Sequence, residues 1–407
     1  MAKLSLAVLL GTLLSLACAD REDEVARTPT AEPEAVPDTS IPTPTRRALW
    51  VLAEGRERVL EDPARVERLI EKASLIGVTD LFVQVYRRGR SWFPSAHADD
   101  APARRLPSSR IGAEAGTLNE LLESAHARGI RVHAWFNVLS LARNAQAPLL
   151  TALGRDAVLV DREGRSLLDY PNQDVPPPDR IHTRLGTPGI YLDPAVPSVV
   201  EYLERTVDDL VLALPALDGL HLDYIRHPVA LPIIPGSRFD LGLDFGYGEI
   251  TRRRFEEWSG GPFHRGDAWD DFRRGQVGVL VQRLCARLPE PWECSAAVLP
   301  WAERAYLAAM QDWRRWLEEG ALDFAVAMAY TRDDRLLRYL AHGLTGGVAG
   351  ERVWLGLGAW LFTDRPERLQ AQLDRALEVS PAGVALFSYD ALIEQPGLLE
   401  GLRWTPK

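Results

Sequence analysis

The chain has 407 residues, of which 46% are hydrophobic and 26% charged, a balance typical of a globular protein. Its net charge of −10 argues against a broad electrostatic surface for nucleic acid or anionic lipid. The length suffices for one large domain, because α/β barrels form single domains of about 250 residues or more.

The first 17 residues have the features of an export signal. Lys3 provides a short positive start, and the apolar run over residues 4–16 is too short to span a bilayer. The run ends in the letters LSLAC, which resemble the lipobox cleaved before a lipid-modified cysteine. We therefore expect residues 1–17 to be a lipoprotein signal peptide and Cys18 to carry the lipid. The alternative is an ordinary secretory signal in which Cys18 has no role.

The residues after Cys18 predict a tether and a location. Residues 18–45 are rich in proline, acids and threonine and nearly lack large apolar groups, so they cannot bury enough surface to fold. Asp20 stands third after the cleavage point, which by resemblance to lipoprotein sorting signals favours the outer membrane. No later run is long and apolar enough for a transmembrane helix. We expect an exported chain, lipid-anchored to the cell envelope, on the outer-membrane or periplasmic side in a Gram-negative host.

The remaining chain alternates short β-rich runs with helical patterns, which predicts a parallel sheet covered by helices. The strand candidates are residues 48–52, 79–86, 131–137, 217–223, 294–299, 324–330, 353–360 and 384–389. The helix candidates include residues 63–75, 118–127, 199–214, 273–287, 306–318 and 366–377.

Eight strand–helix units favour a closed barrel over an open doubly wound sheet. An open sheet usually carries a glycine-rich phosphate turn after its first strand, and residues 50–55 show no such pattern. We expect residues 46–405 to form a single (β/α)₈ TIM barrel of the α/β class. Long loops are expected after strands three and four, at residues 139–192 and 227–250, where barrels place their active sites.

Two further cysteines lie far downstream of Cys18. Cys285 and Cys294 are nine residues apart, at the predicted end of a helix and start of a strand. In an exported chain they could form a disulfide, and two buried free thiols are the equal alternative. No zinc-type spacing of cysteines is present, and we expect neither metal nor cofactor.

Side chains of one parity on each strand face the barrel interior, so polar groups at the strand ends should converge at one mouth. The side chains expected there are Gln84, Tyr86, His133, Trp135, Asn137, His221, Asp223, Met328, Tyr330, Ser388 and Asp390. A purely structural barrel would place Val, Ile and Leu at these positions.

Each of these residues also has a structural interpretation. His221 could be a satisfied core histidine, and Asp223 could be an ion-pair partner of Arg226. Trp135 and Tyr330 could be core aromatics. The convergence of an acid, amides and aromatics at one mouth favours a sugar site, because hydroxyls need polar partners and sugar faces stack on indole rings. No nucleophile elbow, Walker loop or zinc-protease helix is present, which weakens other hydrolase classes.

Several segments resemble the signatures of the glycosyl-hydrolase-like family 10. They are residues 83–86 (VQVY), 133–137 (HAWFN), 192–194 (LDP), 218–228 (DGLHLDYIRHP), 311–313 (QDW), 320–324, 328–330 (MAY) and 386–390 (LFSYD). The HLDYIR segment is the most specific. The resemblance implies a barrel glycosidase acting on polysaccharide, with bacterial cell-wall glycan as a substrate class, and members are often lipoproteins.

The chain also resembles retaining barrel glycosidases with a nucleophilic aspartate at the end of strand four, which implies that Asp223 is the nucleophile. Glycosidic cleavage needs a second carboxyl as proton donor, and the candidates are Asp390 and Glu303, with Asp333 and Asp334 less favoured. The expected substrate-binding residues are Gln84, Tyr86, His133, Trp135, Asn137, His221, Tyr224, Arg226 and Tyr330.

Two other functions remain open. A glycan-binding lipoprotein without catalysis would keep the stacking residues but lack a competent acid. A metal-assisted hydrolase of an amide or ester would use His133, His221 and Asp223 as a ligand set.

Overall fold

The computed structural model describes residues 45–107, 116–233, 236–347, 349–395, 397–399 and 401–404. The predicted signal peptide (residues 1–17), Cys18 and the tether (residues 18–45, except residue 45) lie outside these residues. Within the described ranges, no helix combines the length and hydropathy that a membrane crossing requires.

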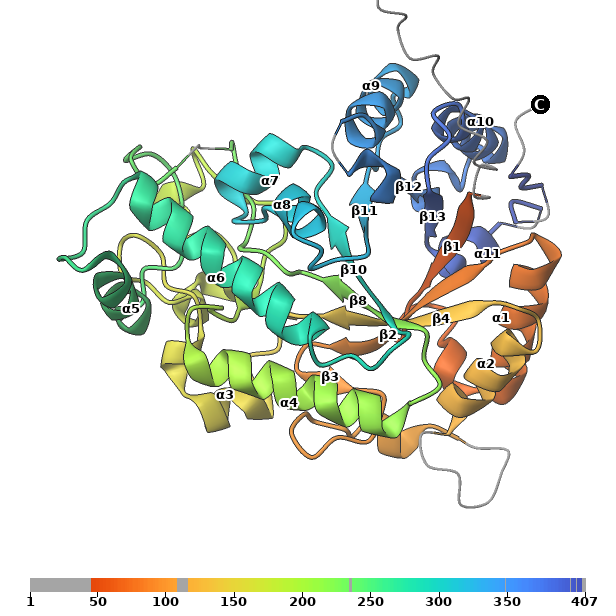
Figure 1. Ribbon diagram of the computed structural model, residues 1–407, viewed down its shortest axis with the longest axis horizontal. Helices are drawn as coiled ribbons and strands as arrows, with labels where there is room; N and C mark the ends of the chain where they lie inside the picture. The colour runs from red at the N-terminus through yellow and green to blue at the C-terminus, as the bar shows by residue number, and fades with distance from the viewer. Residues whose placement is uncertain are drawn as a thin grey trace, which may run out of the picture. The chain divides into compact units, whose positions relative to one another are not determined.

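Eight parallel strands close into a barrel, as the alternating pattern predicts (Figure 1). They are β1 (Arg46–Val51), β2 (Asp80–Arg87), β4 (Arg131–Asn137), β8 (Gly219–Asp223), β10 (Glu293–Val298), β11 (Phe324–Met328), β12 (Val353–Gly358) and β13 (Gly383–Phe387). Each strand pairs with the next one in this order, and β1 pairs with both β2 and β13, which closes the ring. The predicted (β/α)₈ fold is confirmed, and every predicted strand lies within a few residues of an observed one.

Helices pack around the outside of the barrel (Figure 1). They are α1 (Pro63–Leu75), α2 (Thr117–His126), α4 (Pro197–Ala213), α6 (Asp267–Cys285), α7 (Ala302–Ala308), α8 (Trp313–Glu318), α9 (Asp334–Thr345), α10 (Pro366–Leu377) and α11 (Tyr389–Ile393). Side-chain caps mark the starts of two of them: Asp62 accepts a hydrogen bond from Ala64 N at 2.9 Å before α1, and Asp333 accepts from Arg335 N and Leu336 N at the start of α9.

One helix prediction is wrong. The sequence pattern predicts one helix over residues 306–318, but the structure has α7 and α8 with a break between them. Met310, in that break, has a φ of 54°, which is left-handed backbone that no α-helix contains. The apolar spacing that suggested one helix therefore belongs to two short helices in succession.

The two long loops lie where they were expected. The connection from β4 to α4 holds β5 (Ser140–Ala142), α3 (Pro148–Leu153), β6 (Arg184–Leu185) and β7 (Ile190–Tyr191). The connection from β8 to α6 holds β9 (Ala230–Leu231) and α5 (Glu249–Ser259). The two loops join each other, because β6 pairs with β9. A short strand, β3 (Arg90–Ser91), folds back antiparallel onto β2.

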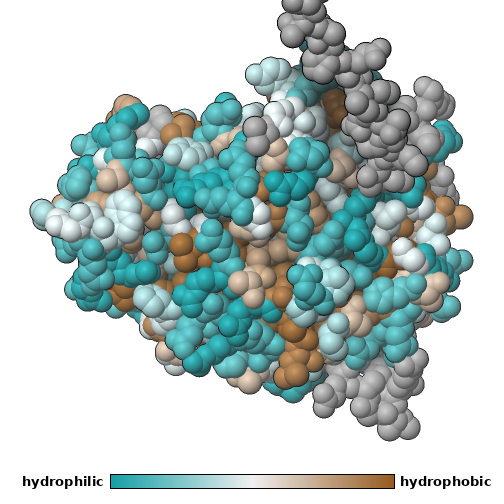
Figure 2. Space-filling model, in the orientation of Figure 1, coloured by the Kyte–Doolittle hydropathy of each residue, from teal (hydrophilic) through white to brown (hydrophobic). Residues whose placement is uncertain are grey.

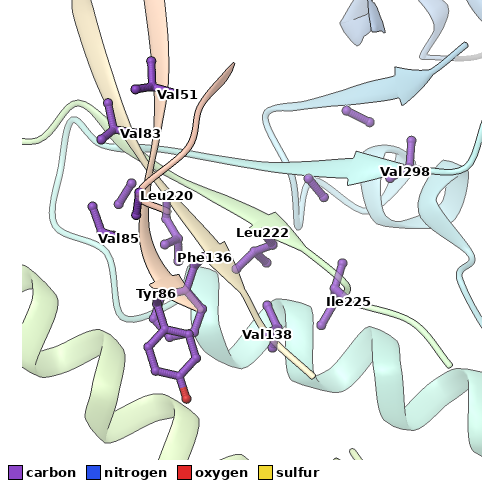
Figure 3. Close-up of a cluster of buried hydrophobic side chains, with 14 of the residues drawn as sticks. Val51, Val83, Val85, Tyr86, Phe136, Val138, Leu220, Leu222, Ile225 and Val298 are labelled. Atoms are coloured by element: carbon purple, nitrogen blue, oxygen red, sulfur yellow. The ribbon is translucent and has the colours of Figure 1, made fainter. Parts of the chain in front are cut away.

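The two faces of the strands differ in chemistry. The outer face carries branched aliphatic residues that pack under the helices, among them Val83, Leu220 and Leu222 (Figure 3). The molecular surface in the view of Figure 2 is mostly hydrophilic, as expected for the solvent sides of such helices.

The inside of the barrel is filled mainly by aromatic rings. Trp50, Phe82, Trp135, Phe324 and Trp354 form one buried cluster. Phe324 stacks on Trp354 with ring centres 4.1 Å apart. Barrels more often fill this space with branched aliphatic residues, so the large flat rings set this interior apart.

The structure pairs Cys285 with Cys294 in a disulfide, with the two Cα atoms 5.7 Å apart. This resolves the alternatives left by the sequence in favour of the disulfide. The bond joins the last residue of α6 to β10, the strand that pairs directly with β8.

Candidate active site

A cavity of about 460 Å³ opens at the carboxyl ends of the barrel strands. Barrel enzymes place their chemistry at this end. It is lined by Trp50, Leu52, Gln84, Arg87, Trp135, Asn137, Thr187, Asp223, Tyr224, Arg226, Ala297, Leu299, Pro300, Trp301, Met328, Tyr330, Trp360 and Phe387. Among the described residues that line it, Asp223 is the one carboxylate.

The Asp223 carboxylate is held by three donors. Trp135 Nε1 donates to Oδ2 at 3.1 Å, and Tyr224 N donates to Oδ1 at 2.6 Å. The Arg226 guanidinium lies 3.4 Å from Oδ1. Asp223 is 6% exposed, so these donors act away from bulk water. They hold the carboxylate in a fixed orientation at the lip of the barrel.

The backbone after Asp223 contributes to this arrangement. Tyr224 has a φ of 51°, which is uncommon for a bulky residue other than glycine. This backbone directly follows the catalytic candidate, and such conformations are concentrated at functional sites. Arg226 in turn lies over the Tyr224 ring, with the guanidinium carbon 4.6 Å from the ring centre.

These surroundings set the protonation states of two other side chains in the cavity, Arg226 and Tyr330. Burial alone lowers the pKa of Arg226, but the charge of Asp223 and the contact with its carboxylate raise it overall, so the guanidinium stays protonated. Burial and the charge of Asp223 raise the pKa of Tyr330 well above its ordinary value. The Tyr330 phenol therefore keeps its proton beside the carboxylate and can donate a hydrogen bond.

A pair of amides lies beside the acid. Gln84 Nε2 donates to Asn137 Oδ1 at 3.4 Å, and Gln84 Oε1 has no hydrogen-bond partner among the described residues. Gln84 is 1% exposed, and an unpaired buried amide oxygen is costly. A ligand hydroxyl that enters the cavity would satisfy it.

Aromatic side chains that the sequence analysis did not assign complete the cavity. Trp301 follows β10, Trp360 follows β12, and they are 36% and 50% exposed. Trp50, Phe387, Arg87 and Thr187 also line the cavity. The parity of β1 could have identified Trp50, because it alternates with Ala48. Trp301 stands in a loop, where no periodicity gives an orientation, and Trp360 lies in a short 3₁₀ helix (Ala359–Phe362) that replaces the predicted end of the strand over residues 353–360.

The predicted binding residues His133 and His221 lie deeper in the barrel than the cavity. Six of the other predicted binding residues line it: Gln84, Trp135, Asn137, Tyr224, Arg226 and Tyr330. His221 accepts from Trp50 Nε1 at 3.1 Å, contacts Ser295 Oγ at 2.9 Å and stacks on Phe82. Burial and the nearby His133 lower the pKa of His221 well below its ordinary value, so the ring is neutral. This matches the structural interpretation of His221 as a satisfied core histidine.

His133 belongs to a charged network at the opposite end of the barrel. Its Nε2 lies 3.1 Å from Asp80 Oδ1, and Arg46 contacts both Asp80 and Glu293. Burial alone raises the pKa of Asp80, but His133 and Arg46 lower it overall. The inward direction predicted for His133 and His221 is correct, but their depth separates them from the cavity.

The orientation predicted for Tyr86 is wrong. The pairing of β2 with β4 shifts between Gln84 and Tyr86, which indicates a bulge. One extra residue reverses the alternation of side chains beyond it. Tyr86 therefore faces outward, where it stacks on Phe136 and donates to Tyr202 Oη of α4 at 3.4 Å (Figure 3).

Neither proton-donor candidate lines the Asp223 cavity. Asp390 lies in the first turn of α11, and its Oδ1 accepts from Glu57 N at 2.9 Å. Burial raises the pKa of Asp390. Glu303 is exposed in the first turn of α7 and lines an adjacent cavity that shares Pro300 and Trp301 with this one. Asp333 caps α9, and Asp334 pairs with Arg368 and Arg375.

The ligand set of the metal alternative is not assembled. His133 contacts Asp80, His221 contacts Trp50 and Ser295, and Asp223 contacts Trp135, Tyr224 and Arg226, as described above. Within the part of the chain that the structure describes, no group of three His, Cys, Asp or Glu side chains has a geometry that could hold a metal ion.

Comparisons with known proteins agree with this architecture. A family model described as glycosyl hydrolase-like 10 matches residues 45–335. Glycosyl hydrolase DigH of Escherichia coli O6:H1 is 25% identical over 353 residues, covering 78% of this chain and 73% of that protein. Glycosyl hydrolase YngK of Bacillus subtilis is 21% identical over 316 residues, covering 72% of this chain and 52% of that one.

Solved structures share the fold. The glycoside hydrolase domain of PgaB (BpsB) from Bordetella bronchiseptica aligns with a TM-score of 0.61 at 15% identity, covering 87% of this chain and 97% of that one. The catalytic domain of β-amylase from Paenibacillus polymyxa aligns with a TM-score of 0.54 at 11% identity, covering 88% and 96%. At these identities the likeness extends to the barrel alone.

Proposed function

Because the chain belongs to the glycosyl hydrolase-like 10 family, we propose that it is a glycoside hydrolase that cleaves a polysaccharide, with Asp223 at its catalytic centre. The observation that carries this proposal is the setting of Asp223: it is the one carboxylate among the described residues that line an aromatic cavity at the carboxyl end of the barrel. Flat indole faces suit sugar rings, and the unpaired Gln84 amide oxygen suits a sugar hydroxyl.

We propose that Asp223 is the nucleophile of a retaining mechanism. Its three donors fix the carboxylate oxygens in place, as attack on an anomeric carbon requires. Asp223 would form a bond to that carbon as the glycosidic bond breaks, and the leaving oxygen would take a proton from a second acid. Water would then release the sugar from Asp223, with the same acid acting as base.

Glu303 is the better-supported proton donor. It stands in the first turn of α7, the helix that follows β10, and β10 is a neighbour of β8 in the ring. It lies directly beyond the wall formed by Pro300 and Trp301, so a substrate that reaches across this wall would contact both acids. Asp390, in contrast, follows β13, which is separated from β8 by three strands, and its Oδ1 is bound to the Glu57 amide.

For the substrate and the location, we propose bacterial cell-wall glycan and the cell envelope. The proposal rests on the lipobox-like segment at residues 14–18, the tether that follows it and the family to which the barrel belongs. A lipid on Cys18 would hold the barrel near the membrane, within reach of an envelope polymer.

The test is the release of reducing ends from a panel of glycans that includes peptide-free peptidoglycan strands. Wild type is compared with Asp223→Asn, and Asp240→Asn on the exposed loop before α5 is the matched control. Activity in wild type and in the control, but not in folded Asp223→Asn, supports the proposal. Equal activity in all three chains would remove Asp223 from the chemistry.

A glycan-binding protein without catalysis remains the second candidate, and one observation favours it. In the structure, no second carboxylate among the described residues shares the Asp223 cavity. This candidate requires that wild type and Asp223→Asn both bind strands and that neither releases reducing ends.

A further inference from the structure

A second, larger hollow adjoins the Asp223 cavity. It has a volume of about 970 Å³, lies beside α7 and α9, and shares Pro300 and Trp301 with the first. We refer to this hollow, lined by residues of the Pro300–Arg304 segment, Arg314 and α9, as the basic groove. A polymer that extends out of the Asp223 cavity past Trp301 would reach it, because both cavities are bounded by that side chain.

The groove is strongly positive in a protein whose net charge is −10. Arg304, Arg314, Arg335 and Arg338 line it together with His342, and Glu303 is its one acidic lining residue. Arg338 pairs with Glu378 at 3.6 Å. Arg304, Arg314 and Arg335 have no carboxylate within 4 Å among the described residues, although Asp333 lies near enough to Arg335 to be influenced by its charge.

Like charges that face one groove repel each other and raise the local potential for an anion. Guanidinium groups bind carboxylates through paired hydrogen bonds, which a neutral sugar does not offer. The concentration of arginines with so few local counter-charges therefore fits an anionic ligand better than a neutral one.

The groove also offers surfaces for sugar rings. Trp301 is 36% exposed, Tyr339 is 76% exposed, and both line the groove. The Arg304 guanidinium lies 5.1 Å from the centre of the Trp301 ring, so a positive charge adjoins this stacking face. This combination would suit a pyranose ring and a carboxylate at neighbouring positions.

We propose that the basic groove binds carboxylate-bearing sugar residues of a polysaccharide whose adjacent residues occupy the Asp223 cavity. The part of this proposal that concerns the Asp223 cavity rests on the proposed glycosidase function. The carboxylate could belong to an ether-linked acid, as in peptide-free peptidoglycan strands, or to a uronic acid.

The test measures binding in a chain that cannot turn over its ligand. Arg304→Gln/Arg335→Gln is introduced into the full-length Asp223→Asn chain, and Arg128→Gln/Arg253→Gln is the matched control. Arg128 and Arg253 are exposed, lie outside both cavities and form no ion pair among the described residues. The probes are peptide-free peptidoglycan strands, the same strands with their carboxyl groups reduced to alcohols, and polygalacturonate.

We expect the groove variant to bind at least one acidic probe roughly fivefold more weakly than the control, an effect that salt diminishes. The two variants should bind the reduced strands equally. The acidic probe that responds identifies the source of the carboxylate. Equal binding of both acidic probes by groove and control variants would overturn the proposal.

Hydrolysis by wild type is recorded separately, so the two proposals fail independently. Arginine-dependent binding without release of reducing ends would support the groove and reject the glycosidase. Release of reducing ends, together with equal binding by the groove and control variants, would support the glycosidase and reject the groove.

Discussion

The indole N–H of Trp135 donates to Asp223 Oδ2 at 3.1 Å, across two adjacent barrel strands. Because Trp135 is paired with His221 and Asn137 with Asp223 in the β4–β8 ladder, the indole reaches diagonally to the carboxylate. The largest rigid side chain of β4 thus fixes the orientation of the acid on β8 and also forms part of the cavity wall.

Trp135→Phe should lower kcat about tenfold or more while retaining a folded barrel. The change keeps an aromatic ring but removes a donor to a charged group, which is worth about 1.5–3 kcal/mol. The measurement is hydrolysis of the polymer on which wild type is active. Trp360→Phe is the control, because Trp360 lines the same cavity and makes no hydrogen bond to Asp223. A similar loss in both variants would mean that stacking, not donation to Asp223, is what Trp135 supplies.

Glu303→Gln should reduce hydrolysis of a natural glycan by about 10²-fold or more and leave a dinitrophenyl glycoside much less affected. Proton donation contributes about 10²–10⁴-fold, but a dinitrophenolate leaves without a proton. Asp390→Asn is the matched variant and should stay near wild type on both substrates. If only Asp390→Asn lost hydrolysis of the natural glycan, Asp390 and not Glu303 would be the proton donor.

The free energy of unfolding should fall as the pH decreases from about 6.5 toward 3. Burial and the charge of Arg273 lower the pKa of His227 to about 3, whereas an unfolded histidine titrates near pH 6.5. Between these values the unfolded chain binds the additional proton, so acid favours unfolding, by up to about 1.4 kcal/mol per pH unit for this group.

His227→Gln should therefore show a shallower loss of stability with acid than wild type, measured by urea unfolding at pH 7 and pH 5. His182→Gln, at an exposed position, should keep the wild-type slope. An unchanged slope in His227→Gln would show that His227 is not the source of the acid sensitivity.

Gly383→Ala should destabilise the barrel by about 1–3 kcal/mol. A Cβ at Gly383 would lie 2.2 Å from Trp354 Cδ2, and Trp354 is packed inside the aromatic interior. Gly275→Ala is the control, because nothing lies within 4 Å of its Cβ position in α6, and there alanine should stabilise the helix by about 0.5–1 kcal/mol. Thermal or urea unfolding of both variants gives the comparison, and equal stability would contradict the tight packing at Gly383.

Strand parity predicts much of the site because a two-residue period depends only on local geometry. Gln84, Trp135 and Asp223 were expected at the mouth and line the cavity. The same rule fails at Tyr86, because the bulge after Gln84 depends on pairing with β4, which the sequence of β2 alone does not contain.

Strand parity also predicts whether a side chain points into the barrel, but not how far it lies from the barrel mouth. His133 and His221 point inward as expected, but their positions along the strands place them among Asp80, Phe82 and Ser295, away from the mouth. Depth depends on how the strands are staggered around the closed ring, which emerges only when all eight are assembled.

Residues just beyond the strand ends were the least predictable part of the site. Trp301 and Trp360 lie just beyond β10 and β12, and their directions follow from the connections to α7 and to the segment before α10. The resemblance to a family located Asp223 and its neighbours, but only the three-dimensional arrangement showed that Glu303 adjoins the cavity from the other side of Trp301.

The indoles around the cavity also give the protein an optical property. Trp50, Trp135, Trp301 and Trp360 all line the volume that a ligand would fill, and two of them are partly open to solvent. Indole fluorescence responds to the polarity of its surroundings, so displacement of water from these rings should shift the emission of the unlabelled chain. Occupancy of the barrel mouth can therefore be followed in a fluorimeter without attaching a dye or waiting for a bond to break.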